Sequence, residues 1–494
     1  MLAALATLCG GSAGPGDSFV DIFVHGEAGF PCWRVPVVVL APSTGILFAF
    51  AEARNYSGDQ CYPDTPAGRA CFRHSSAPSC VGPRSLALKL SRDGGRSWGP
   101  VRIVDWNGAN PAAVYDSKFD RVIVHYPTPG QDSGRASGHR GIGGTNTKQM
   151  ICEASGQCDP PTSLDPWLVW PGGWPLGLKP GTPLHISAGP GLGTQLTRGP
   201  HTGRLVFAGH IQPAGRQAVL VWFSDDGART WSLSNTSFSN TRSQGLGCGT
   251  AEGCFSEPTV VQLPDGTLQL NARNESKSCN STDCCAFGCG FLATPCCHSS
   301  QGCAHSPHTH PRTVADSTDA GATFGRAYQQ ADLPEPVSGC AASTITIGQV
   351  VLFSGPAGPT EMRTNMSIRR SDDGGHTYPR SLQIWAGPGG YSTLTRLPAD
   401  GTPGSCSQML RDSCPAAVRS STGILQCDSC AAHHQGALKA SGCTAQEVQE
   451  WCTSPGGMST DQVGLVFERD SGGWAGGCWG AACRISFAHV PLAL

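Results

Sequence analysis

Short runs of hydrophobic residues, separated by polar turns, recur along the whole chain. Runs such as 86–90 (LALKL) and 218–223 (AVLVWF) have the length and the residue types that are typical of strands. The apolar segment 35–53 (VPVVVLAPSTGILFAFAEA) is broken by Pro42 and Gly45, which predicts two strands. The best pattern for a local helix is at 437–452 (ALKASGCTAQEVQEWC). We therefore expect an all-β protein.

Four of these segments lead into the same polar turn, with the pattern Ser-x-Asp-x-(Gly/Ala)-x-(Ser/Thr)-aromatic. The copies stand at 91–98, 224–231, 317–324 and 371–378. The aspartate can accept hydrogen bonds from backbone amides, the glycine permits a left-handed conformation, and the aromatic side chain can pack back onto the sheet. Repeated units with such turns predict a β-propeller. Because the copies are unevenly spaced, some blades must lack the turn or carry insertions.

Composition and charge narrow the class of protein. The 65 glycines and 38 prolines in 494 residues suit many short strands and turns, and no linker or charge block divides residues 18–494, so we expect one domain there. The chain has 34 Lys and Arg against 36 Asp and Glu, and it has no basic run. We therefore expect neither nucleic acid nor anionic membranes as partners. Without an apolar stretch near the ~20 residues of a spanning helix, we expect a soluble protein with a small substrate.

Several segments, in order, resemble the sialidase (neuraminidase) family, from about residue 18 to the end of the sequence. The resemblance implies a six-bladed β-propeller whose repeated turns are that family's Asp boxes, and it is closest to the lysosomal and bacterial exo-α-sialidases. The matching segments are 32–54 (CWRVPVVVLAPSTGILFAFAEAR), 256–273 (SEPTVVQLPDGTLQLNAR), 363–379 (RTNMSIRRSDDGGHTYP), 389–401 (GGYSTLTRLPADG), 462–470 (QVGLVFERD) and 484–492 (RISFAHVPL).

Three arginines are candidates for binding an anion. Arg34, Arg273 and Arg363 each precede or end a predicted strand in a different blade, and propeller strands converge on the central axis. A guanidinium group is permanently charged and matches a carboxylate with two parallel hydrogen bonds, so three of them suit the carboxylate of a sialic acid. The resemblance adds Arg54 as a further pocket residue and Asp59 as the general acid/base, with Asp64 as the alternative carboxylate.

Glu257 and Tyr391 are the candidate catalytic pair. The anomeric carbon of sialic acid carries a carboxylate, which would repel an acidic nucleophile, whereas a neutral phenol avoids this repulsion but needs a base. The resemblance implies that Tyr391 is the nucleophile and Glu257 its base. Many bacterial members have an Asp-Pro pair that binds the sugar, whereas this chain has Asn110 before Pro111. An asparagine can still hydrogen-bond a sugar hydroxyl, so the resemblance implies that Asn110 binds substrate. The preference between N-acetylated and deaminated sugars therefore stays open.

Cysteine is abundant, with 25 residues, and much of it lies in two segments. Seven cysteines fall within 279–303 and six within 406–452, which we interpret as disulfide-linked loop insertions at about 279–311 and 404–460. Zinc binding is the alternative for the first segment, because His298, His305, His308 and His310 accompany it. For the catalytic site we expect neither a metal nor another cofactor.

The combined expectation is a retaining exo-α-sialidase acting on terminal sialic acids of glycoproteins, gangliosides and oligosaccharides. The alternatives are a trans-sialidase, a non-catalytic propeller that binds sialoglycans, and a receptor or scaffold built on the same turns. Cysteine content, the resemblance and a signal-like segment at 1–17 predict a lysosomal or secreted protein, associated with membranes through substrate or partners if at all. The sequence identifies no protein partner.

Overall fold

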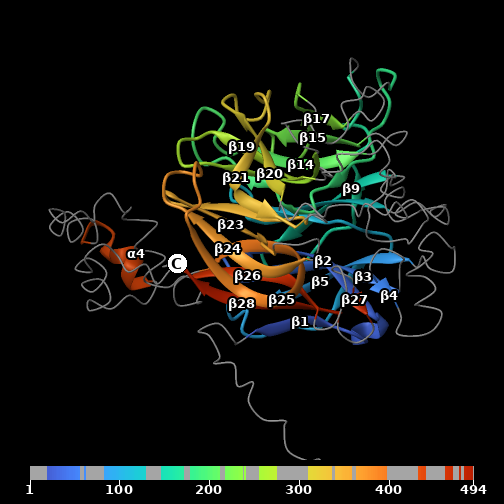
Figure 1. Ribbon diagram of the computed structural model, residues 1–494, viewed down its shortest axis with the longest axis vertical. Helices are drawn as coiled ribbons and strands as arrows, with labels where there is room; N and C mark the ends of the chain where they lie inside the picture. The colour runs from blue at the N-terminus through green and yellow to red at the C-terminus, as the bar shows by residue number, and fades with distance from the viewer. Residues whose placement is uncertain are drawn as a thin grey trace, which may run out of the picture.

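Antiparallel β-strands form almost all of the regular structure in the computed structural model of the chain (Figure 1). Two short helices accompany the strands in the described residues, the 3-10 helix η1 (Glu27–Gly29) and the helix α4 (Gln435–Ala440). The all-β class is therefore confirmed. The structure describes residues 19–55, 61–62, 83–128, 146–171, 178–211, 217–236, 238–240, 255–274, 310–336, 340–358, 363–397, 432–440, 462–470, 478–479 and 483–492.

The first four sheets follow one another along the chain. The first has the order β2 (Cys32–Ala41), β3 (Ile46–Arg54), β5 (Arg84–Ser91), β6 (Arg102–Asp105). The second has the order β10 (Thr162–Ser163), β9 (Asn146–Glu153), β8 (Arg121–Thr128), β7 (Ala112–Asp116), β12 (Gly191–Leu192). The third has the order β11 (Ser187–Ala188), β14 (Leu205–Ile211), β15 (Gln217–Ser224), β16 (Ser232–Leu233), with β13 (Thr194–Gln195) on β14 and β17 (Phe238–Asn240) on β15. The fourth has the order β18 (Phe255–Gln262), β19 (Leu268–Asn274), β20 (His310–Ser317), β21 (Tyr328–Glu335).

A seven-stranded sheet joins the two ends of the described chain. Its order is β1 (Val20–Val24), β28 (Cys483–Pro491), β26 (Gln462–Asp470), β25 (Arg380–Leu397), β24 (Thr364–Ser371), β23 (Val350–Pro356), β22 (Ser343–Ile347). Residues 380–388 of β25 pair with β24 and residues 389–397 pair with β26, so this long strand serves two sheet units. A separate parallel pair consists of β4 (Cys61–Tyr62) and β27 (Cys478–Trp479).

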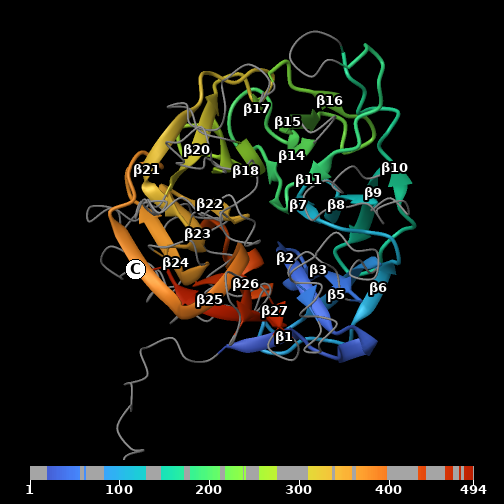
Figure 2. The same ribbon diagram turned by 45° about the vertical axis from the view of Figure 1, so that its right-hand side comes forward.

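The sheets are arranged around a common centre. In Figure 2, β2, β7, β18 and β22 lie near the middle, whereas β6, β10 and β21 lie at the rim. This radial order of antiparallel sheets is that of a β-propeller, in which each sheet buries its faces against its neighbours. The count of six blades stays a prediction.

The four repeated turns, which we name the Ser-Asp turns, share one hydrogen-bond pattern. In the copy at 224–231, Ser224 Oγ donates to Asp226 Oδ1 (2.8 Å), and the Ala228 amide donates to Ser224 Oγ (2.9 Å). The Thr230 amide and hydroxyl donate to the two Asp226 oxygens at 3.0 and 2.6 Å. The same four bonds recur in the other three copies. Each turn begins at the last residue of β5, β15, β20 or β24 and connects that strand to the next.

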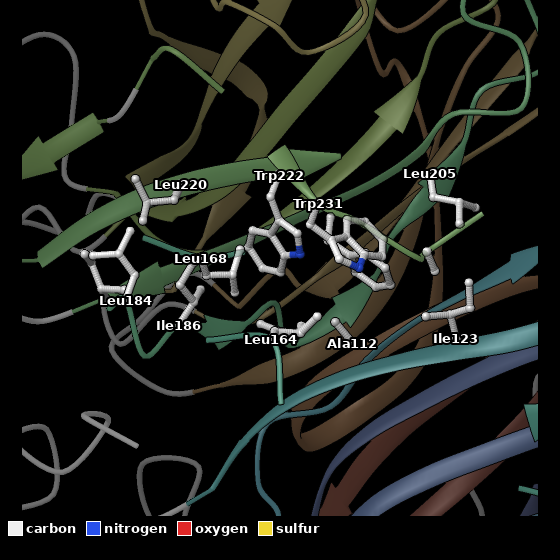
Figure 3. Close-up of a cluster of buried hydrophobic side chains, with 14 of the residues drawn as sticks. Ala112, Ile123, Leu164, Leu168, Leu184, Ile186, Leu205, Leu220, Trp222 and Trp231 are labelled. Carbon is white, nitrogen blue, oxygen red and sulfur yellow. The ribbon is translucent and has the colours of Figure 1, made fainter. Parts of the chain in front are cut away.

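The largest hydrophobic cluster fills the space between the second and third sheets (Figure 3). Trp222 of β15 and Trp231 of a Ser-Asp turn lie among leucine and isoleucine side chains there, and both tryptophans are buried. Trp231 Nε1 donates to Gln149 Oε1 of β9 at 2.9 Å, which satisfies its polar atom. The turn aromatic therefore packs back onto the sheets and joins two of them.

Other expectations fall partly outside the described residues. The strands predicted within 35–53 are β2 and β3, whereas of the predicted helix 437–452 the structure describes the part that lies in α4. Both cysteine-rich insertions lie almost entirely outside the described residues, so their disulfides stay a prediction. Elsewhere, disulfides join Cys32 to Cys61 and Cys152 to Cys158. In the described part of the chain, no helix has the length and apolar character needed to span a bilayer.

Candidate active site

Tyr391 lies among three buried arginines that come from different parts of the propeller. Arg34 is on β2, Arg273 is on β19, and Arg363 directly precedes β24. The Cζ atoms of Arg34 and Arg363 are 5.3 and 5.2 Å from the centroid of the Tyr391 ring. Arg273 Nη1 is 3.4 Å from the Tyr391 hydroxyl. The structure thus brings together the three arginines that the sequence suggested for anion binding.

Glu257 contacts the same tyrosine. The Tyr391 hydroxyl donates a short hydrogen bond to Glu257 Oε1, and Arg273 Nη1 donates to Glu257 Oε2 at 2.7 Å. Burial alone would raise the pKa of Glu257, but the electrostatic effects of Arg273 and His210 and these hydrogen bonds outweigh it and lower the pKa to about 2. Burial, followed by the Glu257 charge, raises the pKa of Tyr391 well above 10.0. The resting pair is therefore a neutral phenol that donates to a carboxylate.

The strands that carry Arg34, Glu257 and Tyr391 have irregular backbone at these residues. The strand register shifts between Arg34 and Val37, between Ser256 and Pro258, and between Gly389 and Ser392. Two of the residues within these shifts have positive φ angles, 55° at Val35 and 27° at Glu257. A valine in this region is a genuine outlier, and such strain concentrates at functional sites. The bulges turn consecutive side chains away from the regular alternation and into the centre.

Glu468 on β26 is a member of this site that the sequence analysis missed. Its Oε1 accepts hydrogen bonds from Arg34 Nε (2.7 Å) and from the Val35 amide (2.8 Å), and its Oε2 accepts from the Tyr391 amide (3.2 Å). A Cβ atom on Gly390 would collide with this carboxylate, so the close approach needs glycine. A charged residue on the same strand face as buried Val466 was the signal that could have identified it.

Arg54 and Asn110 are joined through a second missed carboxylate, Glu52. Arg54 Nε donates to Glu52 Oε2 at 2.6 Å, and the Asn110 amide donates to Glu52 Oε1 at 2.5 Å. The Asn110 side chain donates to Ser187 Oγ at 2.8 Å. Burial would raise the pKa of Glu52, but the charges of Arg54 and Arg84 lower it overall. Glu52 is the register partner of Arg34, so this group adjoins the arginine cluster.

The other predictions from the sequence concern the general acid/base and a metal site. Asp59 and its alternative Asp64 lie outside the described residues, so the general acid/base assignment stays a prediction. In the part of the chain that the structure describes, no group of three or more His, Cys, Asp or Glu side chains could hold a metal ion. A cavity of about 290 Å³ lies elsewhere, against Asp116, His201, Arg204 and Asp225, and no predicted site residue lines it.

The chain is similar in sequence to known proteins. The BNR repeat-like domain family matches residues 298–403. A sialidase from Micromonospora viridifaciens is 28% identical over 404 residues, which cover 78% of this chain and 51% of the relative. The chain thus spans about half the length of this curated relative.

Two solved structures share the fold over nearly the whole chain. One is Trypanosoma rangeli sialidase in complex with 2,3-difluorosialic acid, described as a covalent intermediate, with a TM-score of 0.54, 16% identity, and coverage of 96% of this chain and 59% of that one. The other is the intramolecular trans-sialidase from Ruminococcus gnavus in complex with oseltamivir carboxylate, with a TM-score of 0.52, 13% identity, and coverage of 96% and 97%. The chain is thus similar to sialidases in sequence and shares the propeller fold of solved sialidases.

Proposed function

We propose that this chain is an exo-α-sialidase that hydrolyses terminal α-ketosidically linked sialic acids with retention of configuration. The observation that supports this best is the hydrogen bond from the Tyr391 hydroxyl to Glu257 inside the arginine cluster. A module that only binds sialoglycans would use the arginines but would need no phenol held against a base. The proposed substrates are glycoproteins, oligosaccharides and glycolipids including gangliosides.

In the proposed mechanism the arginines bind the substrate carboxylate and place the anomeric carbon beside Tyr391. Guanidinium groups of Arg34, Arg273 and Arg363 supply fixed positive charge in a buried site, where charge–charge attraction is stronger than in water. The same charges oppose the rise in the pKa of Tyr391 that burial and Glu257 cause. They thus ease the loss of the phenolic proton when the bond to the sugar forms.

The chemical steps follow from the pair at the centre. Tyr391 Oη attacks the anomeric carbon while Glu257 takes its proton, the bond to the aglycone oxygen breaks, and a carboxylic acid, which we assign to Asp59, protonates that oxygen. Water, deprotonated by the same Asp59, then attacks from the opposite face and releases Tyr391, which regains its proton from Glu257. Two inversions leave the product with the α configuration.

Replacing Tyr391 by Phe tests this assignment. We expect loss of most hydrolysis of 4-methylumbelliferyl α-sialoside, while a dehydrated sialic acid still binds because the arginines remain. Tyr378→Phe is the matched control, because Tyr378 is also buried, in a Ser-Asp turn, and in the described structure its hydroxyl has no hydrogen-bond partner. Proton NMR of the product of the parent enzyme should show the α-anomer first. An initial β-anomer would rule out Tyr391 as the nucleophile.

Transfer to another sugar is the second candidate activity, because one similar structure is of an intramolecular trans-sialidase. Product analysis with and without added lactose separates the two activities. Free sialic acid as the main product supports hydrolysis, whereas anhydro-sialic acid or sialyllactose would support transfer.

For the compartment, we propose the lysosomal lumen or secretion. Disulfides such as Cys32–Cys61 are typical of proteins that fold in an oxidising, extracytoplasmic environment and support this proposal. Localisation of the tagged full-length chain, with a thiol-alkylation count, tests it. A cytosolic, fully active protein with free thiols at both pairs would contradict the proposal.

A further inference from the structure

We propose that Trp106 is a stacking platform for the sugar residues that precede the terminal sialic acid. This inference rests on the proposed function and names the part of the site that binds the aglycone. Trp106 is 71% exposed, whereas the other exposed large hydrophobic side chains of the described residues are 39–41% exposed. It follows directly after the end of β6.

Strand register places Trp106 on the same face of the propeller as the candidate active site. β2 begins near Arg34, and its partner β3 ends at Arg54. Arg54 pairs with Arg84 at the start of β5, and the next residues of β5 pair with the end of β6. Arg34, Arg54, Arg84 and Trp106 therefore all lie near one end of the four strands, on one face of the propeller. The Ser-Asp turn at 91–98 lies at the other end of the strands, on the opposite face.

The loop that leads from Trp106 to the pocket is short. Asn110, whose amide binds Glu52, follows four residues later, so the two Cα atoms are at most ~14 Å apart. Gly108 packs tightly in this loop, because a Cβ there would lie 3.0 Å from Leu86 Cβ and from the Tyr126 ring. The indole is therefore within reach of the sugars that follow a sialic acid bound near Arg54 and Asn110.

The backbone that carries Trp106 is held on both sides. Ser85 Oγ donates to the Trp106 carbonyl at 3.2 Å, and the Asn107 amide donates to Asp105 Oδ1 at 2.9 Å. Asp105 Oδ2 in turn accepts from Tyr126 Oη (2.9 Å) and Lys148 Nζ (2.7 Å). A firmly held loop that exposes a large aromatic ring is pre-organised for a ligand, because little ordering entropy is lost on binding.

The surroundings of the ring favour a carbohydrate. One side of the indole is backed by Phe30, with ring centroids 6.3 Å apart, and Phe30 packs on buried Trp33. The residues on either side of Trp106 in the chain, Asp105 and Asn107, are polar. A sugar has an apolar C–H face and a polar rim of hydroxyls, which matches a single aromatic ring with hydrogen-bonding neighbours. A lipid surface would be better matched by a broad apolar patch.

The test compares substrates with short and long aglycones. For Trp106→Ala we expect the KM for sialyllactose to rise roughly five- to tenfold, where tenfold corresponds to about 1.4 kcal/mol of binding. For 4-methylumbelliferyl α-sialoside, kcat/KM should change less than about twofold. Trp167→Ala, which removes another exposed tryptophan, is the control and should alter neither substrate. Equal effects of Trp106→Ala on both substrates, or none, would overturn the platform.

A binding measurement separates this inference from the proposed reaction. Saturation-transfer NMR of sialyllactose with the Tyr391→Phe protein should show contact with the galactose and glucose protons. The contact should vanish when Trp106→Ala is added and persist when Trp167→Ala is added. Sugar contact without hydrolysis by the parent would reject the sialidase activity and retain the platform. Loss of binding to ganglioside-free lipid vesicles in Trp106→Ala, with unchanged sialyllactose contacts, would replace it by a lipid contact.

Discussion

Replacing Glu468 by Gln tests whether the arginine cluster depends on a carboxylate behind it. In the native protein Glu468 accepts from Arg34 Nε, from the Val35 amide and from the Tyr391 amide, and it is 5% exposed. Glutamine has nearly the same shape but no charge, and its side-chain NH2 group donates hydrogen bonds where a carboxylate oxygen would accept them. This NH2 group must therefore face one of the three native donors, and Arg34 loses the negative charge that compensates its positive charge.

The expected loss of stability in Glu468→Gln follows from the burial of the ion pair between Glu468 and Arg34. Removing one partner of a buried ion pair typically costs about 3–5 kcal/mol of stability, because the remaining charge is poorly compensated. We expect Glu468→Gln to lose about 3 kcal/mol in the free energy of unfolding. Because Glu468 holds both Arg34 and the Tyr391 amide, we expect kcat/KM also to fall by roughly 100-fold, as for small misplacements of reacting groups.

Urea unfolding and steady-state kinetics measure the two effects. Glu153→Gln is the matched control, because Glu153 is exposed on β9 and should change the unfolding free energy by less than about 0.5 kcal/mol. Parent-like stability together with parent-like kcat/KM would refute the role of Glu468 in positioning Arg34.

Two further predictions concern the same cluster. Arg363→Lys keeps the charge but loses the planar fork, so we expect KM to rise at least roughly tenfold with folding intact. Arg370→Lys, on the strand β24 that follows Arg363, is the control, and an unchanged KM for Arg363→Lys would remove Arg363 from the site. Glu257 has a pKa of about 2 in the folded protein against an ordinary value of 4.5, so its ionisation stabilises the fold above about 4.5, and this stabilisation is lost as the pH falls toward about 2. The difference in unfolding free energy between the parent and Glu257→Gln should therefore shrink over that range, and a difference independent of pH would contradict the lowered pKa.

Sequence reasoning succeeded where a residue type has a local mechanical role. The strands β2 and β3 and the four Ser-Asp turns follow from apolar runs and from turn chemistry, both of which act over a few residues. The grouping of Arg34, Arg273 and Arg363 was also expected, because strands of a propeller converge. Neither inference required knowledge of distant pairing.

The sequence did not reveal the residues that support the cluster from other strands. Glu468 and Glu52 look like ordinary charged residues at strand ends, and their roles depend on bulges that change which way neighbouring side chains point. The joining of Cys32 to Cys61 likewise depends on how two segments meet in space. Such features are consequences of register, which periodicity alone leaves undetermined.

The pairing of β1 with β28 has a consequence for how the protein matures during synthesis. The contact of Arg34 with Glu468 joins residues 434 positions apart, and it links β2 of the first sheet to β26 of the sheet in which β1 pairs with β28. A ribosome-bound chain that has emerged through the fourth sheet would already hold Arg34, Glu257 and Arg273, but not Tyr391 or Glu468. Because contacts of such long separation form late, the candidate active site is completed when the final strands are added and not gradually.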